Sequence, residues 1–226
     1  MNKFTLLTLA FLGTTALHAE LVTEHFKNGV LKSQINYKDG TRTDTEEGVK
    51  DGLEKAYYNT GELAYKVTYV EGKRHGAMDW YDREGNHLER INYNMGKREG
   101  NNKTFFSDGK LRIEVNYVND NKEGTEKYYF NTGKLASEVN YIHGKKEGLQ
   151  KEYNEDGTLN NEVTYKHGYK EGEKRWYDKK GKVIKTLTYK MDRPIDLMKK
   201  VQAKKPDATV EALKGLDFNP NNRKVD

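Results

Sequence analysis

The sequence predicts an all-β protein: an elongated antiparallel meander of 24-residue β-hairpin repeats with a short C-terminal helical cap. Two series of glycines set the period, and neither slips in its five steps. The first series is Gly52, Gly76, Gly100, Gly124, Gly148 and Gly172, and the second follows nine residues later as Gly61, Gly85, Gly109, Gly133, Gly157 and Gly181. Such a fixed period is typical of repeat architectures, in which each unit packs only on its neighbours.

Each unit has the alternation of a half-buried strand. In the unit 124–147, Leu135, Val139 and Tyr141 are an even number of residues apart. Even spacing places side chains on one face of a strand, so we expect these three to share a face while polar residues occupy the other. The segment around Tyr129 is predicted to be the partner strand of the hairpin.

Glycine-containing turns join the predicted strands. The segment Asn131–Gly133 separates the two strands of one unit, and Gly144–Gly148 leads into the next. A short loop that ends in glycine suits a hairpin, because glycine adopts positive φ without penalty. A lone hairpin is marginal in water, so the units are expected to stack into one continuous sheet.

The sequence divides into four segments. Residues 1–19 are predicted to be a signal peptide, 20–51 a degenerate first repeat with an acidic insertion, and 52–192 six regular repeats. The period stops after Tyr189, and Pro194 is a residue type that can open a helix. We therefore predict a helical cap and a disordered basic tail over 193–226.

The N-terminus indicates export. A short basic start precedes the apolar run Phe4–Leu17, and Ala19 offers a small residue before the cut, with cleavage after Ala16 as the alternative. No other apolar stretch approaches 18 residues, so no membrane helix is expected. We predict a secreted or periplasmic protein, and the absence of cysteine excludes disulfides, thiolate metal sites and a lipid-modified cysteine.

The charge pattern argues against nucleic-acid binding. The chain has 40 basic and 35 acidic residues, but the body from 20 to 192 holds 31 basic and 30 acidic ones. The basic excess lies mainly in the C-terminal tail. A nucleic-acid-binding domain normally presents a basic face, which this nearly neutral body does not predict.

The repeat resembles a known family. The order aromatic, turn glycine, leucine, two apolar or aromatic positions and then Gly-Lys-Arg-Glu-Gly resembles the MORN repeat, and more closely the bacterial MORN variant of the YwqK-type antitoxin family. The residues that carry the match, with their copies in other units, are Tyr129, Gly133, Leu135, Tyr141, Gly144 and Gly148. The resemblance implies a sheet of hairpins and roles in membrane or protein scaffolding. The chain lacks the motifs of the lipid-kinase domain that follows some MORN arrays.

No residue set predicts catalysis, a cofactor or a metal. Two of the histidines, His143 and His167, occupy equivalent turns that are roughly 9–10 Å apart, too far to share zinc. The glutamate series of the turns has identical surroundings in every copy, whereas acid–base catalysis needs two groups with different pKa values. The other histidines of the mature chain are His25, His75 and His87, and the glutamates are Glu99, Glu123, Glu147 and Glu171.

Three series could bind a partner. The basic residues of the return turns are predicted to line one edge of the sheet, either as a strip for anionic lipid or polysaccharide or as solvated turns. They are Lys73, Arg74, Lys97, Arg98, Lys122, Lys145, Lys146 and Lys170. The tyrosine ladder is predicted to be core: Tyr57, Tyr81, Phe105, Tyr129, Tyr153 and Tyr177. The variable aromatics are candidate contacts: Tyr58, Phe106 and Phe130 at one position and Trp80, Tyr128 and Trp176 at another.

The sequence therefore predicts a non-catalytic exported scaffold that binds a protein or an envelope component through its sheet. Two alternatives remain. One is a module that binds anionic membrane surfaces through the basic edge and tail, and the other is an antitoxin-like inhibitor of a secreted toxin. The ligand and the oligomeric state are not determined by the sequence.

Overall fold

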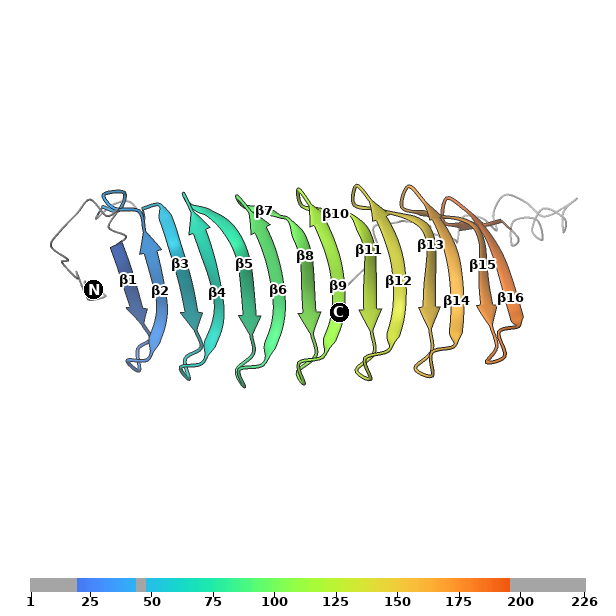
Figure 1. Cartoon of the computed structure of the whole chain (residues 1–226), viewed down its shortest axis with the longest axis horizontal. Coiled ribbons are helices and arrows are strands. Elements are labelled where there is room, and N and C mark those ends of the chain that lie inside the picture. The colour runs from blue at the N-terminus through green and yellow to red at the C-terminus, as the bar shows by residue number, and fades with distance from the viewer. Residues whose placement is uncertain (1–19, 44–47, 196–226) are drawn as a thin grey trace, which may run out of the picture.

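The computed structural model describes residues 20–43 and 48–195 and contains one long open sheet of 17 strands (Figure 1). The strands are β1 (Glu20–His25), β2 (Leu31–Tyr37), β3 (Lys50–Tyr57), β4 (Leu63–Val70), β5 (Lys73–Tyr81), β6 (His87–Asn94), β7 (Lys97–Arg98), β8 (Gly100–Phe105), β9 (Leu111–Val118), β10 (Asn121–Lys122), β11 (Gly124–Tyr129), β12 (Leu135–Ile142), β13 (Lys145–Tyr153), β14 (Leu159–Lys166), β15 (Tyr169–Tyr177), β16 (Val183–Lys190) and β17 (Arg193–Pro194).

The strands form an antiparallel meander, as the glycine period predicts. Apart from the end strands and two split strands, each strand pairs with the strand before it and the strand after it in the sequence, for example β2 with β1 and β3. At two places the return strand is split in two: β7 and β8 both pair with β6, and β10 and β11 both pair with β9. The predicted all-β repeat architecture is confirmed.

A bulge in each hairpin changes which residues share a face. The register shifts between Tyr128 and Tyr129, which pairs with Leu135, so Ala136 is an extra residue in its strand. An extra residue reverses the alternation beyond it. Leu135 therefore faces away from Val139, and the expectation that they share a face is wrong. The same shift recurs in the other hairpins.

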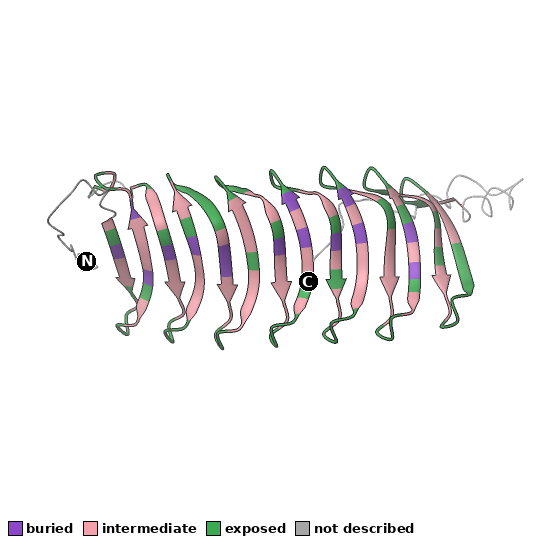
Figure 2. Ribbon diagram, viewed as in Figure 1, coloured by how far each residue is buried: buried purple, intermediate pink, exposed green. Residues whose placement is uncertain are grey.

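Buried residues lie almost entirely on one face of the sheet, which we call the valine face because it carries Val67, Val115, Val139 and Val163. Figure 2 shows the buried positions as a band across successive strands. Val67 is only 1% exposed. Aromatic neighbours on the same face contribute to such burial, as where the rings of Tyr65 and Trp80 lie 4.7 Å apart. Among the described residues, Asp79 is the only buried residue on the opposite face of the sheet.

The turns connect one unit to the next. The glycine loops follow the expected geometry, and Gly133, with φ of 82°, donates its N–H to the carbonyl of Phe130. In the return turns Gly144 donates its N–H to the Lys122 carbonyl of the preceding unit at 2.9 Å. The glutamate series accepts backbone N–H groups across the same gap, for example Glu123 Oε2 from His143 at 2.8 Å. These glutamates couple adjacent turns.

Three predicted segments fall outside the described residues: the signal peptide, residues 44–47 of the insertion, and the helical cap and tail beyond Ile195. At the start of the predicted cap, Pro194 lies in β17 and pairs with Tyr189 of β16, and Ile195 is helical. Within 20–43 and 48–195 there is no helix with the length and hydropathy that a membrane span requires.

Candidate binding face

Three parallel rows of side chains cross the valine face. In the first row each residue pairs directly with the next across the sheet, and the residue type changes at nearly every step. We call it the variable row: Glu24, Ser33, Ala56, Tyr65, Trp80, Glu89, Thr104, Ile113, Tyr128, Ser137, Glu152, Asn161, Trp176 and Lys185. Three of the variable aromatics that the sequence indicates as contacts, Trp80, Tyr128 and Trp176, are in this row.

A second row on the same face pairs tyrosines with cations at constant positions. Each cation pairs across the sheet with the tyrosine of one unit and lies over the tyrosine ring of the next unit. We call these residues together the tyrosine–cation row. The cross-sheet pairs are Tyr37 with Lys50, Tyr69 with Arg74, Tyr93 with Arg98, Tyr117 with Lys122, Tyr141 with Lys146 and Tyr165 with Lys170. The valines lie between the two rows.

The cation-to-ring distances favour cation–π attraction, which operates within about 6 Å of the ring centroid. The Arg98 guanidinium carbon lies 4.2 Å from the centroid of Tyr117. The other cations lie between 4.8 and 5.3 Å from theirs. The aliphatic stems of lysine and arginine can cover apolar surface beneath their charged ends, so this row is also part of the packing around the valines.

The predicted basic edge is therefore only partly correct. In each Lys/Arg pair the first residue, such as Lys97, lies in the exposed turn, while the second, such as Arg98, lies against a tyrosine on the valine face. One signal in the sequence distinguishes the two positions. The second is always Lys or Arg, whereas the first includes Val49, Asn121 and Tyr169.

Acidic groups balance some of these cations but not all in the same way. Lys50 Nζ lies 3.0 Å from Glu54, and Lys122 forms an ion pair with Glu126. Lys146 instead donates to the neutral Gln150 at 2.9 Å. Burial lowers the pKa of the Lys146 ammonium, and the positive charges of neighbouring lysines lower it further, while nearby carboxylates partly offset this. Lys146 therefore has a neutral amide at the position where Lys122 has the carboxylate of Glu126.

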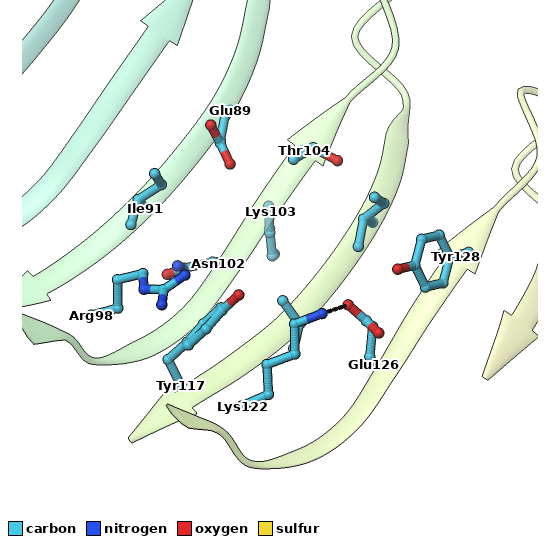
Figure 3. Close-up of a pocket in the computed structure, with 12 residues that line it drawn as sticks. Glu89, Ile91, Arg98, Asn102, Lys103, Thr104, Tyr117, Lys122, Glu126 and Tyr128 are labelled. Carbon is cyan, nitrogen blue, oxygen red and sulfur yellow. Dashed lines mark hydrogen bonds and ion pairs between the residues drawn. The ribbon is translucent and has the colours of Figure 1, made fainter. Parts of the chain in front are cut away.

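A shallow pocket of about 230 Å³ lies between the rows, lined by residues of β6 to β11 (Figure 3). Glu89 and Thr104 line it from the variable row, and Arg98 and Tyr117 from the tyrosine–cation row. Burial raises the pKa of the Glu89 carboxyl, and the charge of Arg98 partly offsets this. Sites for drug-sized molecules usually exceed about 300 Å³, so the pocket suits one side chain or small group of a larger partner.

Comparison with protein families decides the classification. The model described as MORN repeat variant matches residues 21–39, 50–71, 98–119, 122–143, 146–167 and 170–191, together more than half of the chain. The chain belongs to the MORN repeat variant family. The match includes the degenerate first repeat and leaves out most of the unit that contains His87.

Other comparisons add little to the MORN classification. No curated protein matches the chain. Among solved structures, a TarM variant from S. aureus, crystallised with fondaparinux, alpha-GlcNAc-glycerol and UDP, is 12% identical over 42% of this chain, with a TM-score of 0.30. A second TarM structure is 13% identical over 39%, with a TM-score of 0.28. The chain spans 19% and 18% of these two proteins.

The tyrosine ladder of the MORN units lies on the opposite face, beyond the bulge. Tyr129 donates its hydroxyl proton to Glu114 at 2.7 Å and Tyr153 donates to Glu138 at 3.1 Å, each from one unit to the preceding one. The ladder is half-buried, so the prediction that it forms the core is wrong. Four members of the ladder, Tyr57, Tyr129, Tyr153 and Tyr177, link MORN units through hydroxyl hydrogen bonds to the preceding unit. Burial and the Glu114 hydrogen bond raise the pKa of Tyr129 to about 12.

The unmatched MORN unit contains an ionic cluster on the opposite face. Asp79 accepts hydrogen bonds from Arg90 Nε at 2.7 Å and Nη2 at 3.2 Å, and His87 Nε2 lies 2.9 Å from the same carboxylate. His87 also stacks on Phe105, with ring centroids 4.7 Å apart. No group of three His, Asp or Glu in 20–43 and 48–195 could hold a metal. The side chains of His143 and His167 are exposed in separate turns.

Proposed function

We propose that this protein is an exported, non-catalytic MORN scaffold that binds an extended protein or envelope component along its valine face. The variable row beside the constant tyrosine–cation row carries the proposal. A constant row can hold any partner that lies across the strands, while a changing row can distinguish one partner from another. Both rows cross the whole sheet, so the contact can extend over many units.

The chemistry of the rows supports this role. Tyrosine, tryptophan and arginine are enriched at binding interfaces because they combine large apolar area with polar groups. The face presents several such residues in register, including Tyr65 beside Trp80 and Arg98 beside Tyr117. The turn glutamates Glu99, Glu123, Glu147 and Glu171 each accept the same backbone N–H bond, so this series does not provide the differing pair of titratable groups that acid–base catalysis requires.

The experiment compares two triple variants in recovery of cross-linked partners from intact cells. One removes Arg74, Arg98 and Lys122 from the tyrosine–cation row, and the control removes Lys55, Lys127 and Lys151 from the opposite face. Both change the net charge equally. We expect partner recovery to fall only in the first variant. Equal recovery from both variants would contradict the proposal.

Export is tested separately. The protein recovered from the envelope fraction or the medium should begin at Glu20, the first residue of β1. N-terminal sequencing of that protein provides the measurement. A chain that keeps residues 1–19 and stays in the cytoplasm would refute export, whatever the valine face binds.

A second candidate function is binding to anionic membrane surfaces. The regular spacing of the six cations in the tyrosine–cation row favours it. Evenly spaced positive charges can attract anionic lipid headgroups, which have no fixed arrangement in a fluid membrane. Liposome sedimentation at low and high salt is the test. Binding lost at high salt, and lost in the tyrosine–cation variant at low salt, favours this candidate. Salt-independent or absent binding removes it.

A further inference from the structure

In the part of the chain that the structure describes, the two ends of the sheet are open strand edges. Among the described residues β1 pairs only with β2, and at the other end β16 pairs with β15 and with the two-residue strand β17. Exposed edges offer unpaired backbone N–H and C=O groups to another strand. The two edges are not equivalent, because β1 is the first strand of a unit and β16 is the last strand of a unit.

The internal unit boundaries show how the last strand of one unit pairs with the next unit. At β6 the short strand β7 pairs with Tyr93 and Asn94, and the longer β8 pairs with Glu89 and Arg90. At the C-terminal edge β17 pairs with Tyr189 and Lys190, as β7 does with its equivalents. Within the described residues no strand takes the place that corresponds to β8. Among residues 20–43 and 48–195, the edge of β16 is therefore paired along one half and unpaired along the other.

Six internal junctions share one register, which predicts the strand that fits this vacancy. Asn161 pairs with Trp176 and Glu162 with Arg175 at one junction, and the other junctions repeat these positions. Strand β1 is equivalent to β15, since each is the first strand of a hairpin. Glu24 and Thr23 of β1 pair with Ser33 and Gln34, just as Trp176 and Arg175 of β15 pair with Lys185 and Thr186.

In that register the side chains of β1 and β16 are complementary. Lys185 would lie opposite Glu24, and Thr186 opposite Thr23, while Leu187 would continue the valine row beside Val22. Opposite charges and threonine pairs directly across a sheet are stabilising. Glu24 already forms an ion pair with Lys32 at 2.9 Å, but both side chains are exposed, and such pairs contribute little.

We propose that a second copy of this chain adds its β1 to β16 of the first, so that copies join head to tail in one continuous sheet. Glu24 and Lys185 are the two ends of the variable row, and the junction makes the row continuous between copies. Because the two surfaces differ, each copy keeps one free edge and can bind a further copy. This inference does not depend on the proposed function.

Disulfide cross-linking tests the register directly, because the chain has no cysteine. Four single variants of the full chain are made: Glu24→Cys, Thr23→Cys, Lys185→Cys and Thr186→Cys. Equimolar mixtures under mild oxidation should cross-link in the matched pairs 24 with 185 and 23 with 186. The mismatched pairs 24 with 186 and 23 with 185 point to opposite faces and should not cross-link above the single-variant controls.

Charge reversal provides the second measurement. Glu24→Lys should weaken self-association by about fivefold in sedimentation equilibrium, and Glu24→Lys combined with Lys185→Glu should restore it. Absent cross-linking, or equal cross-linking in matched and mismatched pairs, overturns the proposal. The same result is expected if the segment after residue 195 occupies the edge of β16. A chain that stays monomeric at every concentration also overturns it.

Discussion

Replacing Asp79 by asparagine should destabilise the protein more than any exposed charge change in the same unit. The carboxylate is 2% exposed and accepts two hydrogen bonds from Arg90, with His87 at 2.9 Å and Lys66 Nζ at 3.6 Å. Removing one partner of a buried ion pair costs about 3–5 kcal/mol. The side chains of these cations are 28–47% exposed and can regain water, which reduces the expected loss to about 2 kcal/mol.

The assay is thermal unfolding followed by circular dichroism, with Glu84→Gln as the matched control. Glu84 lies in the exposed loop of the same unit, so its loss should change stability by less than about 0.5 kcal/mol. A loss of about 2 kcal/mol lowers Tm by roughly 4–8 °C in a protein of this size. Equal Tm values for the two variants would refute the ionic account of Asp79.

The same variant should change how the free energy of unfolding depends on pH at acidic pH. Burial alone raises the pKa of the Asp79 carboxyl, but hydrogen bonds and charge from Arg90, with the charges of His87 and Lys66, outweigh this and lower it overall. A lowered folded-state pKa contributes stability that is present above the unfolded pKa of about 3.9 and is lost as pH falls through the folded value. Asp79→Asn should therefore flatten the stability profile below about pH 4.

Three further outcomes are expected. Tyr129→Phe should cost about 1–2 kcal/mol by leaving Glu114 without its donor. Because the folded pKa of Tyr129 is raised to about 12, its contribution should be present below pH ~10 and lost as pH rises toward that value, and the variant should lack this loss. Arg98→Met should cost about 0.5–1 kcal/mol in wild type and less when Tyr117 is already Leu, as a double-mutant cycle would measure. Gly52→Ala, at φ of 102°, should cost at least about 1 kcal/mol in urea unfolding.

The architecture follows from local sequence signals. Glycine at fixed spacing marks the turns, and alternation between turns marks the strands, so antiparallel order and unit boundaries can be derived without tertiary information. Each unit contacts only its neighbours, which keeps the number of possible arrangements small. The prediction therefore holds across the described sheet.

The faces could not be derived by counting alone. Even spacing places Leu135 with Val139, but the bulge at Ala136 reverses the alternation, and a bulge depends on how the two strands close the loop. The tyrosine–cation row was missed for a similar reason. Arg98 and Tyr117 are separated by a whole hairpin, and only the stacking of units brings them within 4.2 Å.

The Asp79 cluster shows what departs from the repeat. His87 occupies a position that elsewhere holds leucine or valine, and this exception is visible in the sequence. Its partner was not visible, because Asp79 alternates with buried Met78 and reads as an ordinary solvent-facing residue. The ion cluster forms only when the bulge turns His87 to the same face.

Site-specific photo-cross-linking in intact cells tests most directly whether the valine face binds the partner. A photoreactive residue is placed at three positions of the variable row and, as matched controls, at the adjacent residues of the opposite face. The pairs are Ala56 and Lys55, Thr104 and Lys103, and Glu152 and Lys151. We predict that one partner is captured at all three variable-row positions and at none of the adjacent ones. Capture mainly from Lys55, Lys103 and Lys151 would contradict the account.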